Sequence, residues 1–408
     1  MTTPRTMKVL HLSSSLKHDE SERGIYAITH ALMRAGHESI VIGAADEDSE
    51  LVTRLLRDDT LYYRLSMPKK SWWALRNVFK LRNLIQEHRP DIVHVHSRTP
   101  AWVLHWALRL IPKDEHPKVV ATMYGFYPLN SYSRALFYAD VIITASISID
   151  KYLKDKLEHK QDELDIAKLP FDIVCIKRGV DVRTFPYRHN SSVYWLHSVF
   201  AEYPELEHKK WLFFPTPIGT EYGQEWLVDI LGNLQDKFPD IHAIIAEDLE
   251  TNHTDQDVAH EEFIQRIHAL GLDSRVTFIG RRPPDMKEWL SSANIVLALA
   301  NRPESIGMTA QQAIHLGTPV IGWAKGAFAD ILATTYPQGL VKEETAIALC
   351  KAVKSHLQNR LRPAMTHEYT IEQMTAETLS VYQSLMPACQ LVEKDRHDNL
   401  VCVRIDDE

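Results

Sequence analysis

Residues 301–330 read NRPESIGMTAQQAIHLGTPVIGWAKGAFAD and follow the apolar run NIVLALA at 294–300. The apolar run predicts a buried strand, and the loop RPESIG after it opens a helix that reaches about Leu316. The tripeptide GTP at 317–319 ends that helix and begins another buried strand at 320–322. A strand, a loop, a helix and a second strand in this order form the repeating unit of a parallel sheet covered by helices.

This tract also predicts a ligand site. Ligands of open parallel sheets bind outside the carboxyl ends of the strands. A helix N-terminus there offers free N–H groups and a positive dipole end to an anion such as a diphosphate. Glu304 would lie beside the anion and is suited to accept hydrogen bonds from hydroxyl groups. The predicted ligand is therefore a sugar phosphate, with the phosphate held by Ser305, Ile306, Gly307, Met308 and Thr309.

Length and composition restrict the possibilities. With 408 residues the chain exceeds what one hydrophobic core usually supports, so two domains are expected. A formal net charge of −8 and a pI of about 6.2 argue against a general nucleic-acid-binding protein. The four cysteines are scattered without a CxxC pair, and residues 1–7 lead directly into a strand, with no signal-like or membrane-spanning segment. We therefore expect a cytoplasmic protein with reduced thiols.

Short apolar runs alternate with helical patterns along the chain, which is the arrangement that builds doubly wound parallel sheets. The first half has a helix at 23–35 ended by Gly36, and its strands are expected at 9–12, 39–43, 92–95, 119–122 and 141–144. After an irregular region at 190–210, strands are expected at 211–214, 241–246, 276–279, 295–299 and 320–322, and helices at 224–237, 254–270, 284–292 and 371–385. The prediction is two Rossmann-like α/β domains facing a cleft.

Several motifs follow one another along the chain: AGHE at 35–38, PDIVHVH at 90–96, ADVIITAS at 139–146, IKRGVD at 176–181 and RPESIG at 302–307. In this order they resemble the retaining glycosyltransferases of family 4, two-domain GT-B enzymes that use a nucleotide-activated sugar. The nearest likeness is to transferases of bacterial lipopolysaccharide core and surface polysaccharide. The resemblance implies an acceptor-side domain at 1–188, a nucleotide-sugar-binding domain at 189–365, a helix at 366–386 that crosses back to the first domain, and a tail at 387–408.

The resemblance also implies roles for single residues. Glu304 matches the first acid of a Glu-x7-Glu pair and is expected to bind the donor sugar, whereas Gln312 stands at the second position and would bind the ribose without a charge-assisted bond. Tyr124 occupies the place of a histidine near the transferred sugar and cannot become a cation near neutral pH. We expect Glu304 and Tyr124 to be catalytic, and a glycine loop at Gly24 to approach the donor or the acceptor.

The cations that the family uses for the diphosphate are missing from this sequence. Pro217 and Tyr222 stand where an arginine and a lysine are usual. Since these enzymes stabilise the leaving diphosphate with protein cations and helix N-termini, without a dedicated metal, another group must compensate. The expected replacements are Arg281, Arg282 and Lys325.

Plainer interpretations stay open at the same positions. The two arginines would form surface ion pairs, with Asp285 or Glu288 as partners. Glu304 would only stabilise the helix dipole, and Gln312 would face solvent.

No metal site is expected. His94 and His96 alternate along a predicted strand, and we expect them on opposite faces, with one of them packed in the core. Neither has a metal-binding partner nearby in the sequence.

The segment from Lys69 to Arg82, KKSWWALRNVFKLR, combines basic residues with two adjacent tryptophans in a helical pattern. Such a segment can lie on an anionic membrane surface, which would suit a lipid-linked acceptor at the inner face of the cytoplasmic membrane. The alternative is a helix whose Trp72, Leu75 and Phe79 pack on the sheet while the basic residues are solvated.

The resulting hypothesis is a glycosyltransferase. It would move a sugar with retention from a UDP- or GDP-linked donor to a saccharide or lipid-linked saccharide, without a further cofactor. The substituted donor-site residues also fit a degenerate transferase fold that acts as a binding or scaffold subunit. The fold alone also fits a sugar-nucleotide epimerase.

Overall fold

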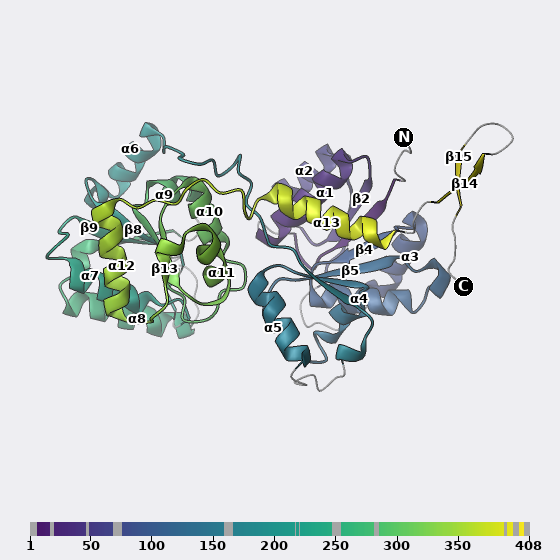
Figure 1. The fold of residues 1–408 in the computed structure, drawn as a ribbon, viewed down its shortest axis with the longest axis horizontal. Coiled ribbons are helices and arrows are strands. Elements are labelled where there is room, and N and C mark those ends of the chain that lie inside the picture. Colours follow the sequence, from purple (N-terminus) through teal and green to yellow (C-terminus); the bar gives the residue numbers. More distant parts are fainter. Residues whose placement is uncertain are drawn as a thin grey trace. The chain divides into compact units, whose positions relative to one another are not determined.

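The computed structural model of the chain describes residues 6–16, 20–45, 49–67, 76–158, 166–216, 218–219, 221–246, 254–280, 285–386, 390–394 and 400–403. The chain divides into two compact units, and Figure 1 labels many of their helices and strands. Unit 1 comprises Met1–Thr144, Tyr152–Ile176 and Gln373–Glu408, and unit 2 comprises Ala145–Lys151 and Lys177–Glu372. Each unit is built on a parallel sheet, which confirms the predicted fold class.

The strands of unit 1 are β1 (Lys8–Leu12), β2 (Glu38–Gly43), β3 (Leu61–Arg64), β4 (Ile92–Val95), β5 (Lys118–Met123), β6 (Val141–Thr144) and β7 (Asp172–Cys175). They form one sheet in the order β3-β2-β1-β4-β5-β6-β7, and every neighbouring pair is parallel. The strand order reverses direction between β1 and β4, so the ligand crevice of such a sheet lies beyond the carboxyl ends of these two strands. Both strands are buried almost throughout, as expected when helices cover both faces.

The helices after these strands are α1 (Glu20–Arg34), α2 (Glu50–Arg57), α3 (Val78–His88), α4 (Arg98–Leu108) and α5 (Ile147–Glu158). Short 3-10 helices occur at Lys113–Glu115, Arg134–Tyr138 and Ile166–Lys168. Gly36 has a φ of 81° and donates its N–H to Met33 O, so it turns the chain out of α1 as predicted.

The C-terminal helix α13 (Ile371–Leu385) contributes its residues from Gln373 onward to unit 1. Met374, Val381 and Tyr382 are buried, and Tyr382 Oη lies 2.5 Å from Nδ1 of His94 on β4. This contact joins residues 288 positions apart in the chain. The described part of the tail forms an antiparallel pair, β14 (Gln390–Lys394) and β15 (Leu400–Val403).

The strands of unit 2 are β8 (Lys210–Phe214), β9 (Ile241–Ala246), β10 (Val276–Ile279), β11 (Ile295–Ala298), β12 (Val320–Trp323) and β13 (Leu340–Val341). Their order is β10-β9-β8-β11-β12-β13, so the switch point lies between β8 and β11. Apolar side chains alternate between two cores on the two faces of this sheet. Phe213 and Val296 belong to one core, and Leu212 and Leu297 belong to the other.

The helices of unit 2 are α6 (Val193–Glu202), α7 (Gln224–Leu234), α8 (Thr254–Ala269), α9 (Met286–Ser292), α10 (Met308–Leu316), α11 (Gly326–Thr335) and α12 (Ala346–Asn359), with 3-10 helices at Pro204–Leu206, Asp273–Arg275 and Pro337–Gly339. The expectation of an irregular region at 190–210 was wrong, because α6 lies within it. Ser192 caps that helix by accepting a hydrogen bond from the Trp195 N–H at 3.1 Å, a signal that the sequence contains.

Each strand predicted from the sequence is present, with ends that differ by no more than two residues. In the two parallel sheets the strands that were missed are β3, β7 and β13, and all three lie at an edge of their sheet; the pair β14 and β15 in the tail was also missed. An edge strand has a neighbour on one side only and is less covered, so it lacks the continuous apolar run that identifies a central strand.

The long segment of unit 2 begins at Lys177, whereas the boundary suggested by the sequence was at residue 189. Val180 donates its N–H to Tyr369 O and accepts from the Ile371 N–H. Arg188 donates its N–H to Leu316 O. These backbone bonds tie the segment before residue 189 to unit 2.

Candidate functional site

The predicted phosphate-binding loop leaves β11 and enters helix α10. Gly307 is the N-cap of α10 with a φ of 70°, and a Cβ placed on it would lie 2.7 Å from Ile331 Cδ1. A side chain there would be strained and crowded, so the backbone requires glycine at this position. Because β11 pairs with β8 at the switch point, the N-terminus of α10 lies at the edge of the sheet where ligands bind.

Glu304 lies in the same loop, on a backbone held from two sides. Its carbonyl accepts the Ala327 N–H of α11 at 2.8 Å, and a Cβ on Gly326 would lie 2.7 Å from Glu304 N. From α10, Gln311 Nε2 donates to the carbonyl of Ile306 at 3.0 Å, a contact that sequence reasoning missed. Glu304 itself is half-buried, so its carboxylate is accessible while its backbone is fixed.

The other residues of this loop and of α10 that are predicted to contact the donor differ in how far they are exposed to solvent. Ser305, Ile306, Met308 and Thr309 are half-buried, and Gly307 is buried. Gln312 is only 5% exposed, so the interpretation in which it faces solvent was wrong. Gln312 lies on the face of α10 that also carries Met308 and Thr309, since residues three and four apart are neighbours on a helix.

Lys325, the N-cap residue of α11 after β12, is already engaged. Its Nζ lies 2.5 Å from Glu344 Oε2 and donates to the carbonyl of Asn301 at 3.2 Å. The carboxylate of Glu344 therefore balances its charge, and a phosphate at this position would compete with that carboxylate for Lys325.

Two acids lie close in sequence to the usual cation positions, Glu221 in the loop after β8 and Glu225 in the first turn of α7. Glu221 forms an ion pair with Arg302, and Glu225 Oε1 accepts from Asn301 Nδ2 at 2.6 Å. Tyr222, at the lysine position, packs its ring 3.0 Å from where a Cβ of Gly219 would stand. Arg302 and Asn301 immediately precede the Pro-Glu-Ser tract. Sequence reasoning did not identify these two contacts, because the carboxylates that bind Arg302 and Asn301 belong to residues about eighty positions earlier in the chain.

Arg281, Arg282 and Pro217 lie outside the described residues. The acids proposed as surface partners of the two arginines bind elsewhere: Asp285 accepts from Trp195 Nε1 at 3.0 Å, and Glu288 lies 2.9 Å from His189 Nε2.

In unit 1, Gly24 and Tyr124 occupy different settings. Gly24 is buried within helix α1, one turn after its start at Glu20, so the expected glycine loop at this position was wrong. Tyr124 follows β5 directly, is half-buried, and places its Oη 2.9 Å from His96 Nδ1. It therefore lies at the carboxyl edge of the sheet, as a ligand contact must.

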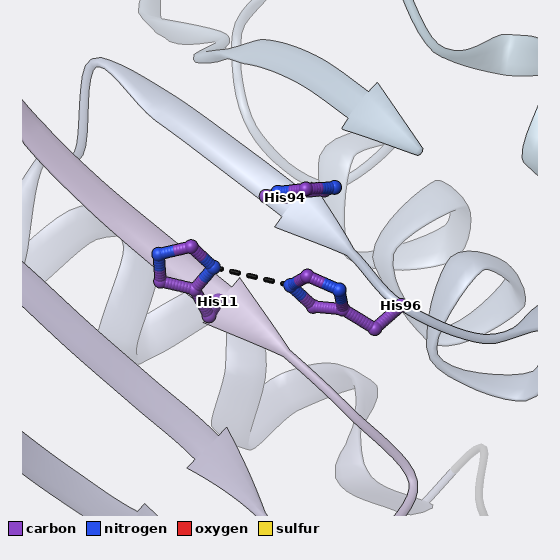
Figure 2. Close-up of side chains that lie close together, drawn as sticks. All are labelled: His11, His94 and His96. Atoms are coloured by element: carbon purple, nitrogen blue, oxygen red, sulfur yellow. Dashed lines mark hydrogen bonds between the residues drawn. The ribbon is translucent and has the colours of Figure 1, made fainter. Parts of the chain in front are cut away.

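A cluster of three buried histidines lies at the switch point of unit 1 (Figure 2). His11 on β1 and His94 on β4 are partners in the parallel register, and His96 follows β4. The expectation that His94 and His96 lie on opposite faces was wrong, because residues two apart on a strand share a face. Burial lowers the pKa of His11 to about 3, and burial followed by the charge of His11 lowers the pKa of His94 well below its ordinary value.

One ring nitrogen from each of the three histidines lies within 4.8 Å of the others, which raises the question of a metal. His94 Nδ1 bonds Tyr382 Oη, and His94 Nε2 bonds Thr122 Oγ1 at 2.7 Å. His11 Nδ1 and His96 Nε2 bond each other at 3.1 Å. To bind a metal together with His11, both His94 and His96 would have to give up ring nitrogens that these hydrogen bonds occupy, so the arrangement fits a hydrogen-bonded network better than a metal cage.

Two family models match the chain. Residues 21–183 match the model described as Glycosyltransferase Family 4, and residues 199–373 match that of Glycosyl transferases group 1. Together they account for most of both units.

Curated relatives match over shorter stretches. The chain is 29% identical over 122 residues to a 2-deoxystreptamine N-acetyl-D-glucosaminyltransferase of Streptomyces fradiae, covering 30% of this chain and 28% of that protein. It is 25% identical over 175 residues to the lipopolysaccharide core biosynthesis mannosyltransferase LpsB of Rhizobium meliloti (strain 1021), covering 40% of this chain and 48% of that protein. The matches thus span less than half the length of these relatives.

Solved structures match almost the whole chain. A glycosyltransferase from Rickettsia africae has a TM-score of 0.75 at 18% identity, covering 93% of this chain and 98% of that one. Anabaena HepE, solved in complex with UDP and glucose, has a TM-score of 0.69 at 16% identity, covering 93% of this chain and 100% of that one. These likenesses establish the GT-B fold.

Proposed function

Because this chain belongs to the family 4 glycosyltransferases of the GT-B fold, we propose that it transfers a sugar from a UDP- or GDP-linked donor to a saccharide or lipid-linked saccharide, with retention at the anomeric carbon. Its relatives in lipopolysaccharide core synthesis support a role in building a cell-surface polysaccharide or lipopolysaccharide. The observation that carries the proposal is the rigid loop at Glu304, which leads into the N-terminus of α10 at the switch point of unit 2.

The donor would use the two features of this loop differently. The first N–H groups of a helix have no partner within the helix and point toward an anion placed at its end. The diphosphate would therefore lie at the first turn of α10, from Ser305 to Thr309. The carboxylate of Glu304 can only accept hydrogen bonds, which suits the hydroxyl groups of the donor sugar.

Charge is the difficult part of this site. As the glycosidic bond breaks, negative charge grows on the leaving diphosphate and needs preorganised positive groups. Arg302 and Lys325 are bound to Glu221 and Glu344 in the described structure. We propose that the diphosphate draws Lys325 away from Glu344, and that Arg281 and Arg282, which follow β10 in the sequence and lie outside the described residues, add their charge.

The test is calorimetric titration with UDP- and GDP-linked hexoses, using Glu304→Gln and, as a matched control, Glu343→Gln, which changes an exposed acid in the loop after β13. We expect one nucleotide series to bind the wild type and the control alike, and Glu304→Gln to weaken sugar-dependent binding. The anomeric configuration of the product, read by NMR, tests retention. If no nucleotide binds at any concentration, the proposed donor site is wrong.

A specific observation favours a second candidate, a binding subunit without transfer activity. Glu221 in the loop after β8 and Glu225 in the first turn of α7 lie close in sequence to the positions where the family has cations, and acids there repel a diphosphate. Absence of binding by any UDP- or GDP-linked sugar would support that candidate, whereas binding with slow donor hydrolysis would support the transferase.

We further propose peripheral contact with an anionic membrane through the region from Lys69 to Arg82. Residues 68–75 lie outside the described residues, but Phe79 on α3 is 65% exposed, which contradicts, for Phe79, the alternative in which it packs on the sheet. Arg82 Nε donates to the carbonyl of Leu110, just beyond the end of the neighbouring helix α4, which exposes Trp106. Among the described helices, none is long and apolar enough to cross a bilayer.

Exposed aromatic side chains beside basic ones favour an interfacial position. Flotation with vesicles containing anionic lipid should capture the wild type, and Phe79→Ser should reduce capture. Tyr194→Ser, which removes a 90% exposed aromatic from unit 2, is the control and should float like the wild type. Equal flotation of Phe79→Ser and the wild type would remove this surface from the proposal.

A further inference from the structure

A chain of two hydrogen bonds leads from the interior of unit 1 to Tyr124. His11 Nδ1 lies 3.1 Å from His96 Nε2, the contact drawn as a dashed line in Figure 2. His96 Nδ1 in turn lies 2.9 Å from Tyr124 Oη. His11 is fully buried and His96 is 4% exposed, so water does not take the place of either bond. The chain begins at β1 and ends at the carboxyl edge of β5.

The two hydrogen bonds can both point toward Tyr124 or both point away from it. The two directions differ in which atom is left without a hydrogen-bond partner. A neutral imidazole has one N–H and one lone pair, so the direction of one bond fixes that of the next. Burial keeps His11 neutral by lowering its pKa to about 3. In one direction, Tyr124 donates to His96 and His96 donates to His11. In the other, His11 donates to His96 and His96 donates to Tyr124.

The atom that distinguishes them is His11 Nε2, which is buried and has no hydrogen-bond partner in the described part of the chain. If Tyr124 starts the chain, His11 must carry its proton on Nε2, where it is a buried donor without an acceptor. If His11 starts the chain, Nε2 is an unprotonated nitrogen. Buried N–H groups without an acceptor are rare in folded proteins, whereas acceptors with unused lone pairs are more common. The second direction is therefore favoured.

We propose that His11 and His96 are positioning residues that direct the hydroxyl of Tyr124, so that Tyr124 accepts from His96 and donates its own proton to an oxygen of the reacting sugar. Tyr124 then presents a hydrogen-bond donor of fixed orientation at the edge of the sheet. His11 and His96 touch no substrate and act only through Tyr124. That Tyr124 donates to an oxygen of a sugar rests on the proposed glycosyltransferase function. The direction of the two hydrogen bonds among His11, His96 and Tyr124 does not rest on it.

The nearby His94 does not belong to this chain. Both of its ring nitrogens bond hydroxyl groups, those of Tyr382 and Thr122. It packs against the chain with its ring centroid 4.0 Å from that of His96 and thereby helps to exclude water.

The orientation can be measured without any substrate. Two-bond proton–nitrogen NMR spectra of the full chain, labelled with 15N-histidine, distinguish a protonated from an unprotonated ring nitrogen. His11→Gln and His96→Gln assign the signals. We expect both residues to carry their proton on Nδ1 and an unprotonated Nε2. A proton on Nε2 of either residue overturns the proposal, and so does a metal-bound nitrogen with stoichiometric zinc in the purified protein.

The consequence for catalysis is tested by hydrolysis of the UDP- or GDP-linked hexose that binds, a reaction that needs no identified acceptor. Tyr124→Phe should lower kcat by about 10²-fold, the usual effect of removing one donor to a transition state, with KM nearly unchanged. His96→Leu should lower kcat similarly. His96→Asn should recover much of it, because the asparagine amide can donate in place of Nδ1.

The matched controls are Tyr63→Phe and His88→Gln, which break a tyrosine–histidine pair of 2.7 Å near the opposite edge of the same sheet. Both should leave kcat unchanged. Equal loss of kcat in His96→Leu and His96→Asn, with both variants folded, would reduce His96 to a packing role and contradict the proposal. Absence of turnover in the wild type would contradict the proposed function and leave the NMR result to decide the orientation.

Discussion

Replacing Gly326 by alanine should both destabilise unit 2 and displace Glu304. Gly326 has a φ of 51°, and an added Cβ would lie 2.7 Å from Glu304 N and 3.0 Å from Pro303 C, closer still to the Glu304 carbonyl oxygen. These are backbone atoms that cannot rotate away. To restore ordinary spacing, the loop must move by roughly 1 Å.

The magnitude follows from two contributions. A left-handed backbone costs a residue with a side chain about 1–2 kcal/mol. Crowding in a well-packed region adds about 1–3 kcal/mol. We therefore expect Gly326→Ala to lower the free energy of unfolding by about 2–5 kcal/mol. A displacement of about 1 Å in a ligand-positioning group costs up to about 10²-fold in activity, so turnover of the donor should fall by a similar factor.

Gly271→Ala separates the two contributions. Gly271 has a φ of 65°, but nothing lies within 4 Å of its added Cβ. It should lose only about 1 kcal/mol, from backbone strain, and keep the donor affinity of the wild type. Urea denaturation and calorimetric titration measure the two quantities. If Gly326→Ala loses no more stability than Gly271→Ala and binds donor normally, α11 does not hold Glu304 in the way described.

Three further changes give sharp outcomes. Glu344→Gln should free Lys325 from its ion pair and raise the affinity for the donor by up to about fivefold at low salt, whereas the control Glu343→Gln should leave the affinity unchanged. Equal calorimetric titration curves for the two variants would exclude Lys325 from phosphate binding. Lowering the pH from 7 to 4 should lower the free energy of unfolding, because the unfolded chain binds a proton at His11 near pH 6.5 while the folded chain binds it only near pH 3. Below pH 6.5 the free energy of unfolding should fall by about 1.4 kcal/mol per pH unit from this residue. His11→Gln should remove that contribution from urea midpoints measured across this range. Tyr382→Phe should lower the free energy of unfolding by about 1–3 kcal/mol, because it leaves His94 Nδ1 without its hydrogen-bond partner. Hydrogen exchange should show that α13 opens faster in this variant than in the control Tyr138→Phe. Identical exchange in the two variants would mean that the Tyr382 hydroxyl does not anchor the helix.

Local sequence patterns predicted the central strands because those strands are continuous apolar runs, and a buried run in a parallel sheet has few alternatives. They also located the loop of Glu304 and the start of α10, because Gly307 and Gly317 mark backbone positions that few other residues tolerate. The edge strands β3, β7 and β13 and helix α6 escaped, since partial exposure weakens the apolar pattern on which prediction depends, whereas the edge strand β10 was predicted.

The histidine cluster shows how a pattern can be present and misread. His94 and His96 lie two residues apart and therefore share a face, so the sequence did contain their proximity. His11 could have been added by placing β1 beside β4, which the doubly wound strand order implies. The direction of the hydrogen bonds could not, because it depends on which buried nitrogen lacks a partner in three dimensions.

The sequence by itself determined the fold class, the family and the position of the candidate donor loop, because each follows from residues close together in the chain. Only the tertiary structure decided that Arg302 pairs with Glu221, that Lys325 pairs with Glu344, and that Tyr124 is bonded to His96. Charge and hydrogen bonding act over a few ångströms, and the residues that meet at that distance come from strands and loops that are remote in sequence. A cation that a motif offers to a ligand can therefore already be bound to a carboxylate that no local pattern reveals.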